Sequence, residues 1–439
     1  MTEGQNILII GSGGREHALG WKLSQSNLVR KTYFATGNGG TSENIGIQPT
    51  QISKLVTFAK ENKCFTIVGP ELPLANGIVN SFVKEGLRIF GPTKEAALLE
   101  SSKEFAKQFM NKNGIPTASF SIFSDAEKAK DYVVKQAETK LVVKADGLAA
   151  GKGVVVCNNL DEAINAVDRI MVKNEFGIAG QKVIIEEHLS GEELSFIALC
   201  DGRTITPLAS CQDHKRIFDN NMGPNTGGMG SYSPTPVIDI KLHEKIMKQV
   251  MVPTIRGMNF QGNPFKGFLY AGLIIDEQRK EPFVLEFNVR MGDPECQPIM
   301  MRMESDLFEY VNSAVDEKLY SLPPVQWKNQ FAVCVVIASK GYPGTYAKKK
   351  LIKGLKYDFG HDTMVFHGDT ALDTQKRIIT NGGRVLGVTA RGDSLKKAID
   401  NAYFTVQKIS WNENGGGCHY RTDIARKYSH VRKPASFFL

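Results

Sequence analysis

Short apolar runs alternate with amphipathic stretches through the first hundred residues. Residues 6–10 (NILII) form a short apolar run that ends at the glycine-rich turn 11–14, which is the pattern of a buried parallel strand. Residues 15–24 carry apolar positions at helical spacing, so we expect a helix after that turn. Further strands are expected at 31–35, 65–68 and 87–90, with helices at 52–62 and 76–84. This alternation predicts an open α/β sheet that ends near residues 91–93.

The pattern changes after this first unit. A helical stretch at 94–113 leads into a compact α/β module at about 119–194, and a larger α+β piece follows from 195. The strands expected here are 141–144, 153–157, 183–187, 195–200, 269–275 and 283–288, with helices at 161–173 and 305–316. Leu322-Pro323-Pro324 is typical of a linker, and a strand at 331–338 opens a small C-terminal α/β unit. At about 150 residues per domain, 439 residues suggest three domains.

Composition narrows the class of protein. Hydrophobic residues make up 42% and charged residues 23%, as in soluble globular proteins. No apolar run approaches the ~18 residues of a membrane span, and the run at 7–10 is too short for a secretory signal. We therefore expect a cytoplasmic protein without membrane contact. Seven scattered cysteines without a CxxC pair favour buried reduced thiols over a zinc or redox site.

The net charge of +8 leaves two kinds of partner open, a nucleic acid or anionic small molecules. The one dense basic run, Lys348–Lys350, is too short for a nucleic-acid footprint. We therefore expect small anionic substrates and no nucleic-acid partner.

Two glycine-rich turns, GSGGREHA (11–18) and GNGGT (37–41), each follow a predicted strand. Such turns offer backbone N–H groups and a helix N-terminus to a phosphate, and two turns at one sheet edge would line one crevice. The first turn departs from the dinucleotide fingerprint because Glu16 stands at the third glycine position. A phosphate site is thus favoured over a nicotinamide site, with a tight turn that binds nothing as the alternative.

A second centre is KADGLAAGKGV (144–154). It falls short of a Walker A loop, because Gly147 to Gly151 is one residue too short and Gly153 stands where Ser or Thr would bind magnesium. What remains is a glycine-rich hairpin with lysines that can fold over a triphosphate. Further along, the strand at 183–187 leads into the acidic connector 186–193. Its backbone can pair with an adenine edge and a later Glu can hold ribose hydroxyls; a solvated acidic loop is the alternative.

The segment LEFNVRMGDPECQ (285–297) carries the clearest chemistry. Glu286, Asn288 and Arg290 alternate along a predicted strand and therefore share one face. Carboxylate and amide oxygens are ligands that magnesium takes, and a guanidinium can hold a phosphoryl group or an acyl phosphate. The segment 213–234 begins with DHKR and continues as a long Gly- and Pro-rich loop. Long ordered loops in compact domains are usually functional.

Together these segments resemble the phosphoribosylamine–glycine ligases, a family of ATP-grasp enzymes. The resemblance rests on GSGGREHAL, GNGGT, VGPELPL (68–74), KADGLAAGKGV, DHKR with GPNTGGMGSYSP, LYAGL (269–273), LEFNVRMGDPE and HYRTDIA (419–425). These motifs follow the order of the family and span about the whole chain. The resemblance implies an ATP-grasp fold of mixed α/β and α+β class. Its parts are a Rossmann-like substrate domain (1–103), an ATP-grasp domain (104–326) with a mobile lid at about 120–193, and a small C-terminal α/β domain (327–439).

The resemblance also implies a reaction. ATP phosphorylates glycine to glycyl phosphate, and 5-phosphoribosylamine displaces the phosphate to give glycinamide ribonucleotide, the second step of purine biosynthesis. Mg²⁺ or Mn²⁺ is the implied metal. The chain ends soon after HYRTDIA, so we expect a monofunctional enzyme. A monomer is expected, with a homodimer left open.

The family motifs assign roles to individual positions. The ATP residues are Lys103, Lys144, Gly147, Gly151, Lys152, Gly153, Glu186, Glu187, Leu189 and Glu193. The catalytic residues are Arg290, Lys215, Asp213 and His214, and the metal ligands are Glu286 and Asn288. The substrate residues are Gly11, Gly13, Gly14, Arg15, Gly39, Gly40, Thr41, Pro70, Glu71, Gly228, Met229, Asp293, Pro294 and Glu295. The strand at 269–272 lacks the further acidic metal ligand of many ATP-grasp enzymes, so the ligands of a second metal stay open.

Three other functions were weighed. An ATP-grasp enzyme for another acid, such as formate or bicarbonate, is disfavoured by the DHKR and GPNTGGMG segments, which belong to the glycine ligases. A nicotinamide oxidoreductase is disfavoured by Glu16. A nucleic-acid binder would rest on the net charge alone and would show a steep salt dependence.

Overall fold

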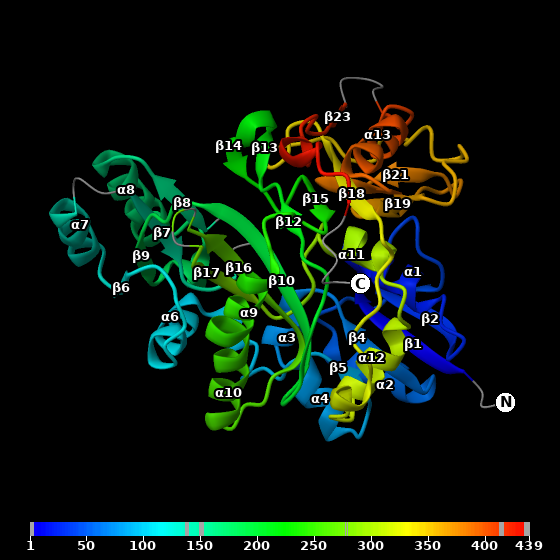
Figure 1. Ribbon diagram of the computed structural model, residues 1–439, viewed down its shortest axis with the longest axis horizontal. Coiled ribbons are helices and arrows are strands. Elements are labelled where there is room, and N and C mark those ends of the chain that lie inside the picture. Colours follow the sequence, from blue (N-terminus) through cyan, green and yellow to red (C-terminus); the bar gives the residue numbers. More distant parts are fainter. Residues whose placement is uncertain are drawn as a thin grey trace.

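A computed structural model of the chain describes residues 4–136, 140–148, 153–276, 278, 280–411 and 417–433. Its four larger sheets are arranged as an N-terminal unit, a projecting lid, a central unit and a C-terminal unit (Figure 1). In that view the lid, with α7 and α8, projects at the left, while the N- and C-terminal units lie at the lower and upper right.

The N-terminal unit is a parallel sheet of five strands in the order β3-β2-β1-β4-β5. The strands are β1 (Gln5–Gly11), β2 (Val29–Thr36), β3 (Asn44–Ile45), β4 (Cys64–Val68) and β5 (Ile89–Phe90). The helices are α1 (Gly14–Leu23), α2 (Ile52–Glu61), α3 (Glu71–Ala75) and α4 (Ile78–Lys84). β1 lies between β2 and β4, and residues 7–10 are fully buried, which explains their unbroken apolar run. The expected open α/β sheet is confirmed.

The helical stretch expected at 94–113 is split into α5 (Leu98–Ser101) and α6 (Lys103–Lys112). Ser102 is the reason: it adopts an extended backbone, and its Oγ accepts the N–H of Phe105 at 3.1 Å, which begins a new helix. The stretch is helical as expected, but it consists of two helices. The break matters for the site because it sets the direction in which α6 presents its lysines.

The lid is a four-stranded sheet in the order β6-β9-β7-β8. Its elements are β6 (Phe120–Phe123), α7 (Ala126–Lys135), β7 (Leu141–Ala145), β8 (Val154–Cys157), α8 (Leu160–Val167) and β9 (Val183–Glu187). Its buried side chains form a separate apolar cluster, including Val133, Val143, Val167 and Ile185. The lid thus has a small core of its own.

The central sheet has the order β11-β10-β16-β17 and is antiparallel. Its strands are β10 (Glu192–Asp201), β11 (Ile205–Pro207), β16 (Lys266–Ile275) and β17 (Pro282–Asn288). The helices around it are α9 (Ile240–Ile246), α10 (Val252–Phe260), α11 (Cys296–Arg302) and α12 (Leu307–Val315). One apolar core runs from the N-terminal sheet into this one, and the rings of Phe90 and Phe268 meet edge to face at 5.0 Å. The predicted boundary at 103/104 therefore lies within one core and stays a prediction.

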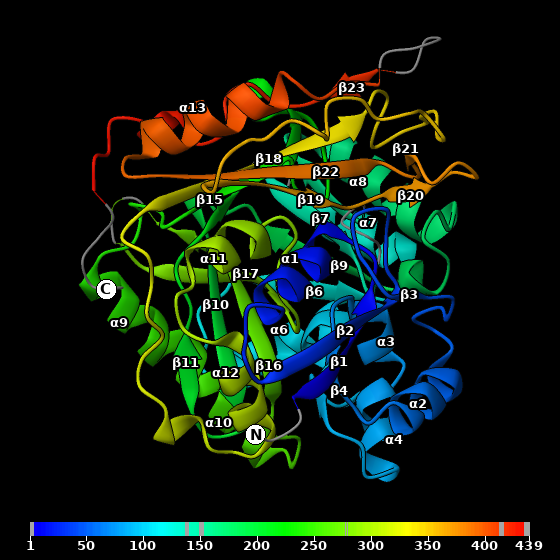
Figure 2. The ribbon, with the colours of Figure 1, turned by 90° about the vertical axis from the view of Figure 1, so that its right-hand side faces the viewer.

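The C-terminal sheet has the order β12-β15-β18-β22-β19, with β23 beside β18 (Figure 2). Its strands are β12 (Gln212–Asp213), β15 (Gly230–Ser233), β18 (Phe331–Ser339), β19 (Thr363–His367), β22 (Arg384–Gly392) and β23 (Cys418–His419). Two hairpins, β13 (Arg216–Phe218) with β14 (Met222–Asn225) and β20 (Thr370–Leu372) with β21 (Ile378–Thr380), and helix α13 (Leu395–Val406) complete the unit.

The segment 213–234 is not the long loop expected from its glycines. It contains the β13–β14 hairpin, and strands β12 and β15 join the C-terminal sheet through β18. These strands are only two to four residues long, so no alternating pattern marks them in the sequence. This segment physically connects the central unit to the C-terminal unit.

Two expectations from composition can be compared with the structure. Six of the seven cysteines are buried, in agreement with the burial expected of them, and Cys418 is half-buried. Among the described residues, no helix has the length and apolar character that a membrane span requires.

Candidate active site

A cavity of about 620 Å³ lies where the four units meet, which is a size typical of small-molecule sites. Eighteen of the predicted site residues line it: Arg15, Pro70, Glu71, Lys103, Lys144, Gly147, Gly153, Glu186, Glu187, Leu189, Glu193, Asp213, Lys215, Glu286, Asn288, Arg290, Asp293 and Glu295. Ten others are absent from its described lining: Gly11, Gly13, Gly14, Gly39, Gly40, Thr41, His214, Gly228, Met229 and Pro294. Gly151 and Lys152 lie outside the described residues.

The predicted face of β17 is present in the structure. Arg290 follows the strand, and its Nη2 donates to Asn288 Oδ1 at 2.9 Å. The same guanidinium forms ion pairs with Glu100 at 2.8 Å and Glu71 at 3.4 Å. Arg290 is therefore held in one orientation from the N-terminal unit, α5 and β17, as a group that recognises a phosphate must be.

Glu286 lies among several cations. Burial alone would raise the pKa of its carboxyl, but Lys215, Lys144 and Lys103 lower that pKa below its usual value. The carboxylate is thus ionised at neutral pH. Glu286 and Asn288 together offer two hard oxygen donors, and no cluster of three or more His, Cys, Asp or Glu occurs among the described residues. This donor set fits Mg²⁺ when phosphate oxygens and water complete the coordination.

Lysines gather where the lid meets the central sheet. Lys144 Nζ lies 2.9 Å from Glu186 Oε2 and donates to the carbonyl of Leu285 at 3.2 Å. Lys103 Nζ donates to the carbonyl of Gly147 at 2.8 Å, so it touches the glycine-rich hairpin directly. Gly147 has φ +104°, a backbone conformation that favours glycine. These contacts bring together the predicted ATP residues of α6, β7, β9 and the hairpin.

Another part of the cavity lining contains the acidic residues Asp213 and Glu295 and one lysine, Lys215. Ser195 Oγ and Tyr270 OH donate to Glu295 Oε1 at 3.1 and 2.7 Å. Burial and the nearby Glu295 raise the pKa of the Asp213 carboxyl well above its usual range, although Lys215 opposes this. The pKa of Lys215 is raised well above its usual value, chiefly by Tyr270. The arrangement provides a cation beside a carboxyl group that can take up a proton.

The C-terminal unit also contributes to the cavity, through Tyr342 and Arg384. Arg384 Nη1 donates to the carbonyls of Gly227 and Asp293, each at 2.5 Å, and Tyr342 OH accepts the N–H of Gly227 at 3.2 Å. No sequence pattern singled out either residue. Arg384 thus joins the segment 213–234 to the Asp293 turn.

In the first glycine turn, the side chain of Glu16 stands where the third glycine of a dinucleotide-binding turn would leave open space. Glu16 accepts the N–H of Gly13 at 2.6 Å and pairs with Arg15 at 2.5 Å. A Cβ on Gly69 would come within 1.9 Å of the Glu16 carboxylate, and one on Gly11 within 2.6 Å of its side chain. Glu16 therefore occupies the space between the ends of β1 and β4, which explains why the turn departs from the nicotinamide fingerprint.

The second glycine turn lies next to the first, as expected from adjacent parallel strands. The N–H of Gly37 donates to the carbonyl of Gly11, and Asn38 Nδ2 donates to that of Ser12 at 2.8 Å. The turn is also packed against the C-terminal unit, because Gly39 N–H donates to Thr370 Oγ1 at 3.0 Å. The structure thus places Gly39, Gly40 and Thr41 at the seam between two units rather than in the lining of the cavity.

His214 and its neighbours lie behind the cavity. Burial lowers the pKa of His214 to about 4, and its Nε2 accepts the N–H of Ala425 at 3.3 Å. Met229 is buried in a small apolar cluster with Ile217 and Ala338. The geometry therefore points to a supporting role for His214 and leaves Asp213 and Lys215 as the lining members of the DHKR motif.

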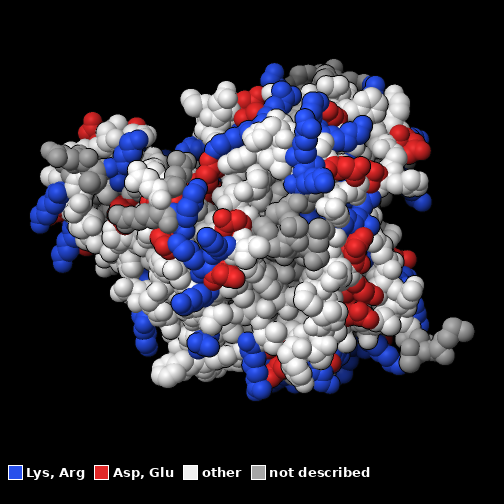
Figure 3. Space-filling view, in the orientation of Figure 1, with Lys and Arg blue, Asp and Glu red and all other residues white. Residues whose placement is uncertain are grey.

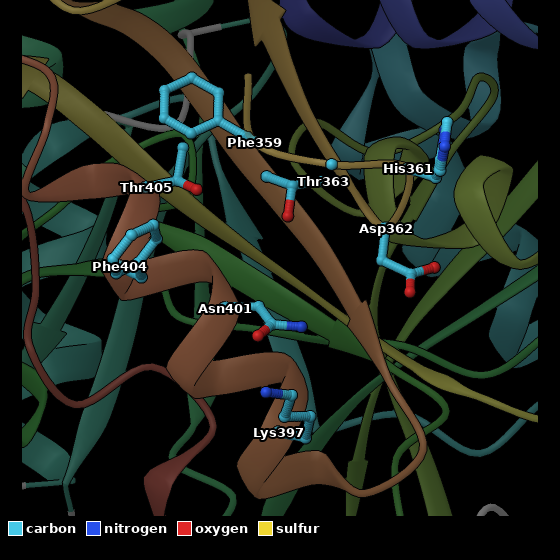
Figure 4. Close-up of a pocket in the computed structure, with 9 residues that line it drawn as sticks. Phe359, His361, Asp362, Thr363, Lys397, Asn401, Phe404 and Thr405 are labelled. Carbon is cyan, nitrogen blue, oxygen red and sulfur yellow. The ribbon is translucent and has the colours of Figure 1, made fainter. Parts of the chain in front are cut away.

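A second, smaller cavity of about 270 Å³ lies on the C-terminal unit between α13 and the segment 359–363 (Figure 4). Phe359 and Phe404 lie toward one end of it and Lys397 toward the other. Some polar groups around it are already paired: Asn401 Nδ2 donates to the carbonyl of Arg391, and Arg391 pairs with Asp362. It contains none of the predicted site residues.

The sequence was compared with protein families and curated relatives. Three family profiles match: the N domain of phosphoribosylglycinamide synthetase at residues 5–100, its ATP-grasp (A) domain at 101–296 and its C domain at 332–427. The chain is 49% identical to the phosphoribosylamine–glycine ligase of Pseudomonas aeruginosa over 95% of its own length and 97% of that protein. It is also 49% identical to that of Neisseria meningitidis over 96% and 99%. The chain belongs to the phosphoribosylamine–glycine ligase family.

Solved structures agree with this membership. The phosphoribosylamine–glycine ligase of Thermotoga maritima matches with a TM-score of 0.82 at 33% identity, over 95% of this chain and 100% of that one. The biotin carboxylase domain of the Hydrogenobacter thermophilus 2-oxoglutarate carboxylase matches with a TM-score of 0.71 at 14% identity, over 99% and 100%. The second match shows the fold alone. The ATP-grasp fold predicted from the motifs is confirmed.

Sequence reasoning missed several residues of this ligase-family cavity. Lys107, Glu100 and Tyr270 line it as well as Tyr342 and Arg384. Lys107 could have been found, because it lies four residues after Lys103 on the same helical face. The others carry no local signal, since their roles depend on which distant segments meet there.

Proposed function

We propose that the chain joins glycine to 5-phosphoribosylamine with ATP, giving glycinamide ribonucleotide, ADP and phosphate. The observation that carries this proposal is the single cavity in which the nucleotide lysines, the Glu286–Asn288–Arg290 face and the DHKR carboxyl and lysine meet. Two substrates and ATP must react in one place, and this cavity is built from all four units. The names of relatives at 49% identity, phosphoribosylamine–glycine ligases, support it.

The first step is transfer of the γ-phosphoryl group of ATP to the glycine carboxylate. Lys103 and Lys144 would hold the phosphates, with Gly147 and Gly153 of the hairpin above them, while Glu186, Glu187 and Leu189 receive the adenine and Glu193 the ribose. Glu286 and Asn288 would hold Mg²⁺ or Mn²⁺, which supplies charge neutralisation at the phosphates. Arg290 would stabilise the glycyl phosphate, since its guanidinium is already oriented by Glu71, Glu100 and Asn288.

In the second step the amine attacks the carbonyl carbon of glycyl phosphate, the C–N bond forms and phosphate leaves. The nitrogen must lose a proton as it attacks. Asp213 is the group that we assign to take it, because its carboxyl group lines the cavity together with Lys215 and burial raises the pKa of that carboxyl, which makes it a stronger proton acceptor. Arg15, Pro70, Glu71, Asp293 and Glu295 line the part of the cavity assigned to the two substrates.

The remaining assignments belong to the same proposal. The domain boundaries are those predicted from the sequence, and the lid at about 120–193 closes over ATP. The enzyme acts as a cytoplasmic monomer on small molecules. On the face of the molecule shown in Figure 3, basic and acidic side chains are interleaved and form no single basic stripe, which supports small molecules rather than a nucleic acid as partners.

Trapping the intermediate tests this proposal. The protein is mixed with ATP, Mg²⁺, glycine and hydroxylamine in the absence of phosphoribosylamine. Glycine hydroxamate should form in proportion to ADP, because hydroxylamine captures an acyl phosphate. Hydroxamate formation with formate or acetate but not with glycine would contradict the substrate assignment while leaving the ATP-grasp fold intact.

A further inference from the structure

Lys107 is a buried cation that the proposed reaction does not use. It lies on α6, is 2% exposed, and its Nζ is 2.8 Å from Glu186 Oε2. Lys144 approaches the same oxygen at 2.9 Å. The same oxygen of Glu186, Oε2, therefore forms ion pairs with both ammonium groups. The other, Oε1, is buried and has no hydrogen-bond partner among the described residues.

The position of Lys107 is set by the body of the molecule. Its Nζ also donates to Thr117 Oγ1 at 2.7 Å, and Thr117 Oγ1 in turn donates to the carbonyl of Val284 on β17 at 2.6 Å. Glu186, by contrast, lies on β9 of the lid. Lys107 is thus held in place on α6 and forms an ion pair with the Glu186 carboxylate of the lid.

The unpaired Oε1 of Glu186 can be satisfied by a hydrogen-bond donor of a ligand bound in the cavity. A buried acceptor that is left unpaired is unfavourable, and a charged one more so. Glu186 lines the cavity, and an ionised carboxylate only accepts hydrogen bonds. A base with an amino group can satisfy Oε1, whereas a base with a carbonyl oxygen at that position brings two acceptors together.

We propose that Lys107 is a positioning residue for nucleotide selection: with Lys144 it holds Glu186 so that Oε1 accepts a hydrogen bond from an amino group of the base. The inference rests on the proposed function, because it takes the nucleotide to bind in this cavity. It goes further by assigning base selectivity to a lysine that touches neither the phosphates nor the reacting carboxylate.

Direct binding tests this inference without using the ligase reaction. ADP and IDP, which carry an amino and a carbonyl group at the same ring position, are titrated with Mg²⁺ into the full-length protein by calorimetry. Wild type should prefer ADP by at least about tenfold. Lys107→Met should weaken ADP at least about tenfold and IDP less than threefold, so that the preference collapses. Lys107→Arg should retain most of the preference for ADP, because arginine keeps a positive charge at this position.

Lys112→Met is the matched control, because Lys112 is an exposed lysine in the last turn of the same helix. It should bind both nucleotides as wild type does. Equal weakening of ADP and IDP in Lys107→Met would show a merely structural role and overturn the inference. If Lys107→Met does not fold, Lys107→Arg decides: a folded Arg variant without preference for ADP overturns the inference too.

A pH profile gives a second readout. Burial and the nearby Lys144 lower the pKa of Lys107 to about 8, against the opposing effect of Glu186 and Glu187. ADP affinity of wild type should therefore fall as the pH rises through about 8, and that of Lys107→Arg should not. Failure of the proposed function looks different: wild type would then bind neither nucleotide, or would bind ADP selectively yet form no glycine hydroxamate.

Discussion

At the scale of single residues, the site is a set of buried charges that compensate one another. Glu286 remains ionised because Lys215, Lys144 and Lys103 surround it. Arg290 is held by two carboxylates and by Asn288. Buried charges are tolerated only when they are paired, so removal of one member should disturb the chemistry strongly.

Glu286→Gln should lower the rate of glycine-dependent phosphate release at least about 100-fold, because the amide keeps the shape but removes the charge that would bind Mg²⁺. The fold should survive, as measured by the melting temperature. Glu281→Gln is the control: Glu281 precedes the same strand, but pairs with Lys245 at 2.5 Å outside the cavity. A Glu286→Gln enzyme that keeps more than a tenth of the rate would remove Glu286 from its role.

Buried histidines provide a residue-scale prediction about acid stability. Burial lowers the pKa of His17 to about 3 and that of His367 to about 4. The unfolded chain therefore binds more protons than the folded one below about pH 6.5, and stability falls as the pH decreases from there to about 4. Each such histidine contributes about 1.4 kcal/mol per pH unit to that fall.

His17→Gln should reduce the slope of the free energy of unfolding against pH by about 1.4 kcal/mol per pH unit between pH 6 and 4. The free energy is measured by unfolding in urea. The exposed His430→Gln should leave the slope unchanged. An unaltered slope in His17→Gln would mean that His17 is protonated in the folded protein.

At the scale of elements, much of the fold could be predicted because it follows from local patterns. β9 lies at 183–187 as expected, β1 and α1 differ from their predicted bounds by one residue at each end, and β17 begins one residue early. The face shared by Glu286, Asn288 and Arg290 follows from strand periodicity alone. The strands within 213–234 were missed because β15 is stabilised by pairing with β18, about a hundred residues away, and β12 pairs in turn with β15.

The same distinction explains the site. Motif residues on one strand or in one turn were found, whereas Arg384 was not, because its partners Gly227 and Asp293 are distant in sequence. Ser102 ends α5 and caps α6, a break that the predicted helical stretch at 94–113 did not include. His214 shares a motif with two lining residues and yet is absent from the described lining of the cavity; its Nε2 instead accepts the N–H of Ala425, which is distant in sequence.

The lid leads to a prediction about an element. It has its own apolar cluster and is tied to the body by polar contacts such as Lys144 to Leu285 and Lys107 to Glu186. We expect MgATP to slow amide hydrogen exchange in β7 and β8, with β18 as the internal control. Equal exchange with and without nucleotide would contradict closure of the lid.

At the scale of the whole molecule, the cavity exists only because four units meet. Arg384 comes from the C-terminal sheet, and its guanidinium holds two carbonyls that belong to the substrate side of the cavity. The C-terminal unit is therefore part of the site and not an appendage.

Arg384→Met should lower kcat/KM for glycine about 10- to 100-fold, because two charge-assisted hydrogen bonds are lost and the Gly227 segment is released. Nucleotide affinity should change little, since Arg384 contacts neither the lid nor α6 in the hydrogen bonds described above. Arg377→Met, at an exposed pair with Asp373, is the matched control. An equal loss in both variants would show that the effect is not specific to the cavity.

The measurement that tests the central claim most directly is phosphate release from ATP with each component omitted in turn. Purified protein, Mg²⁺, glycine and phosphoribosylamine generated in place from ribose 5-phosphate and ammonia are combined. The account predicts stoichiometric ADP, phosphate and glycinamide ribonucleotide only when glycine and the amine are both present. Sustained phosphate release that ignores glycine and responds to another small acid would contradict it.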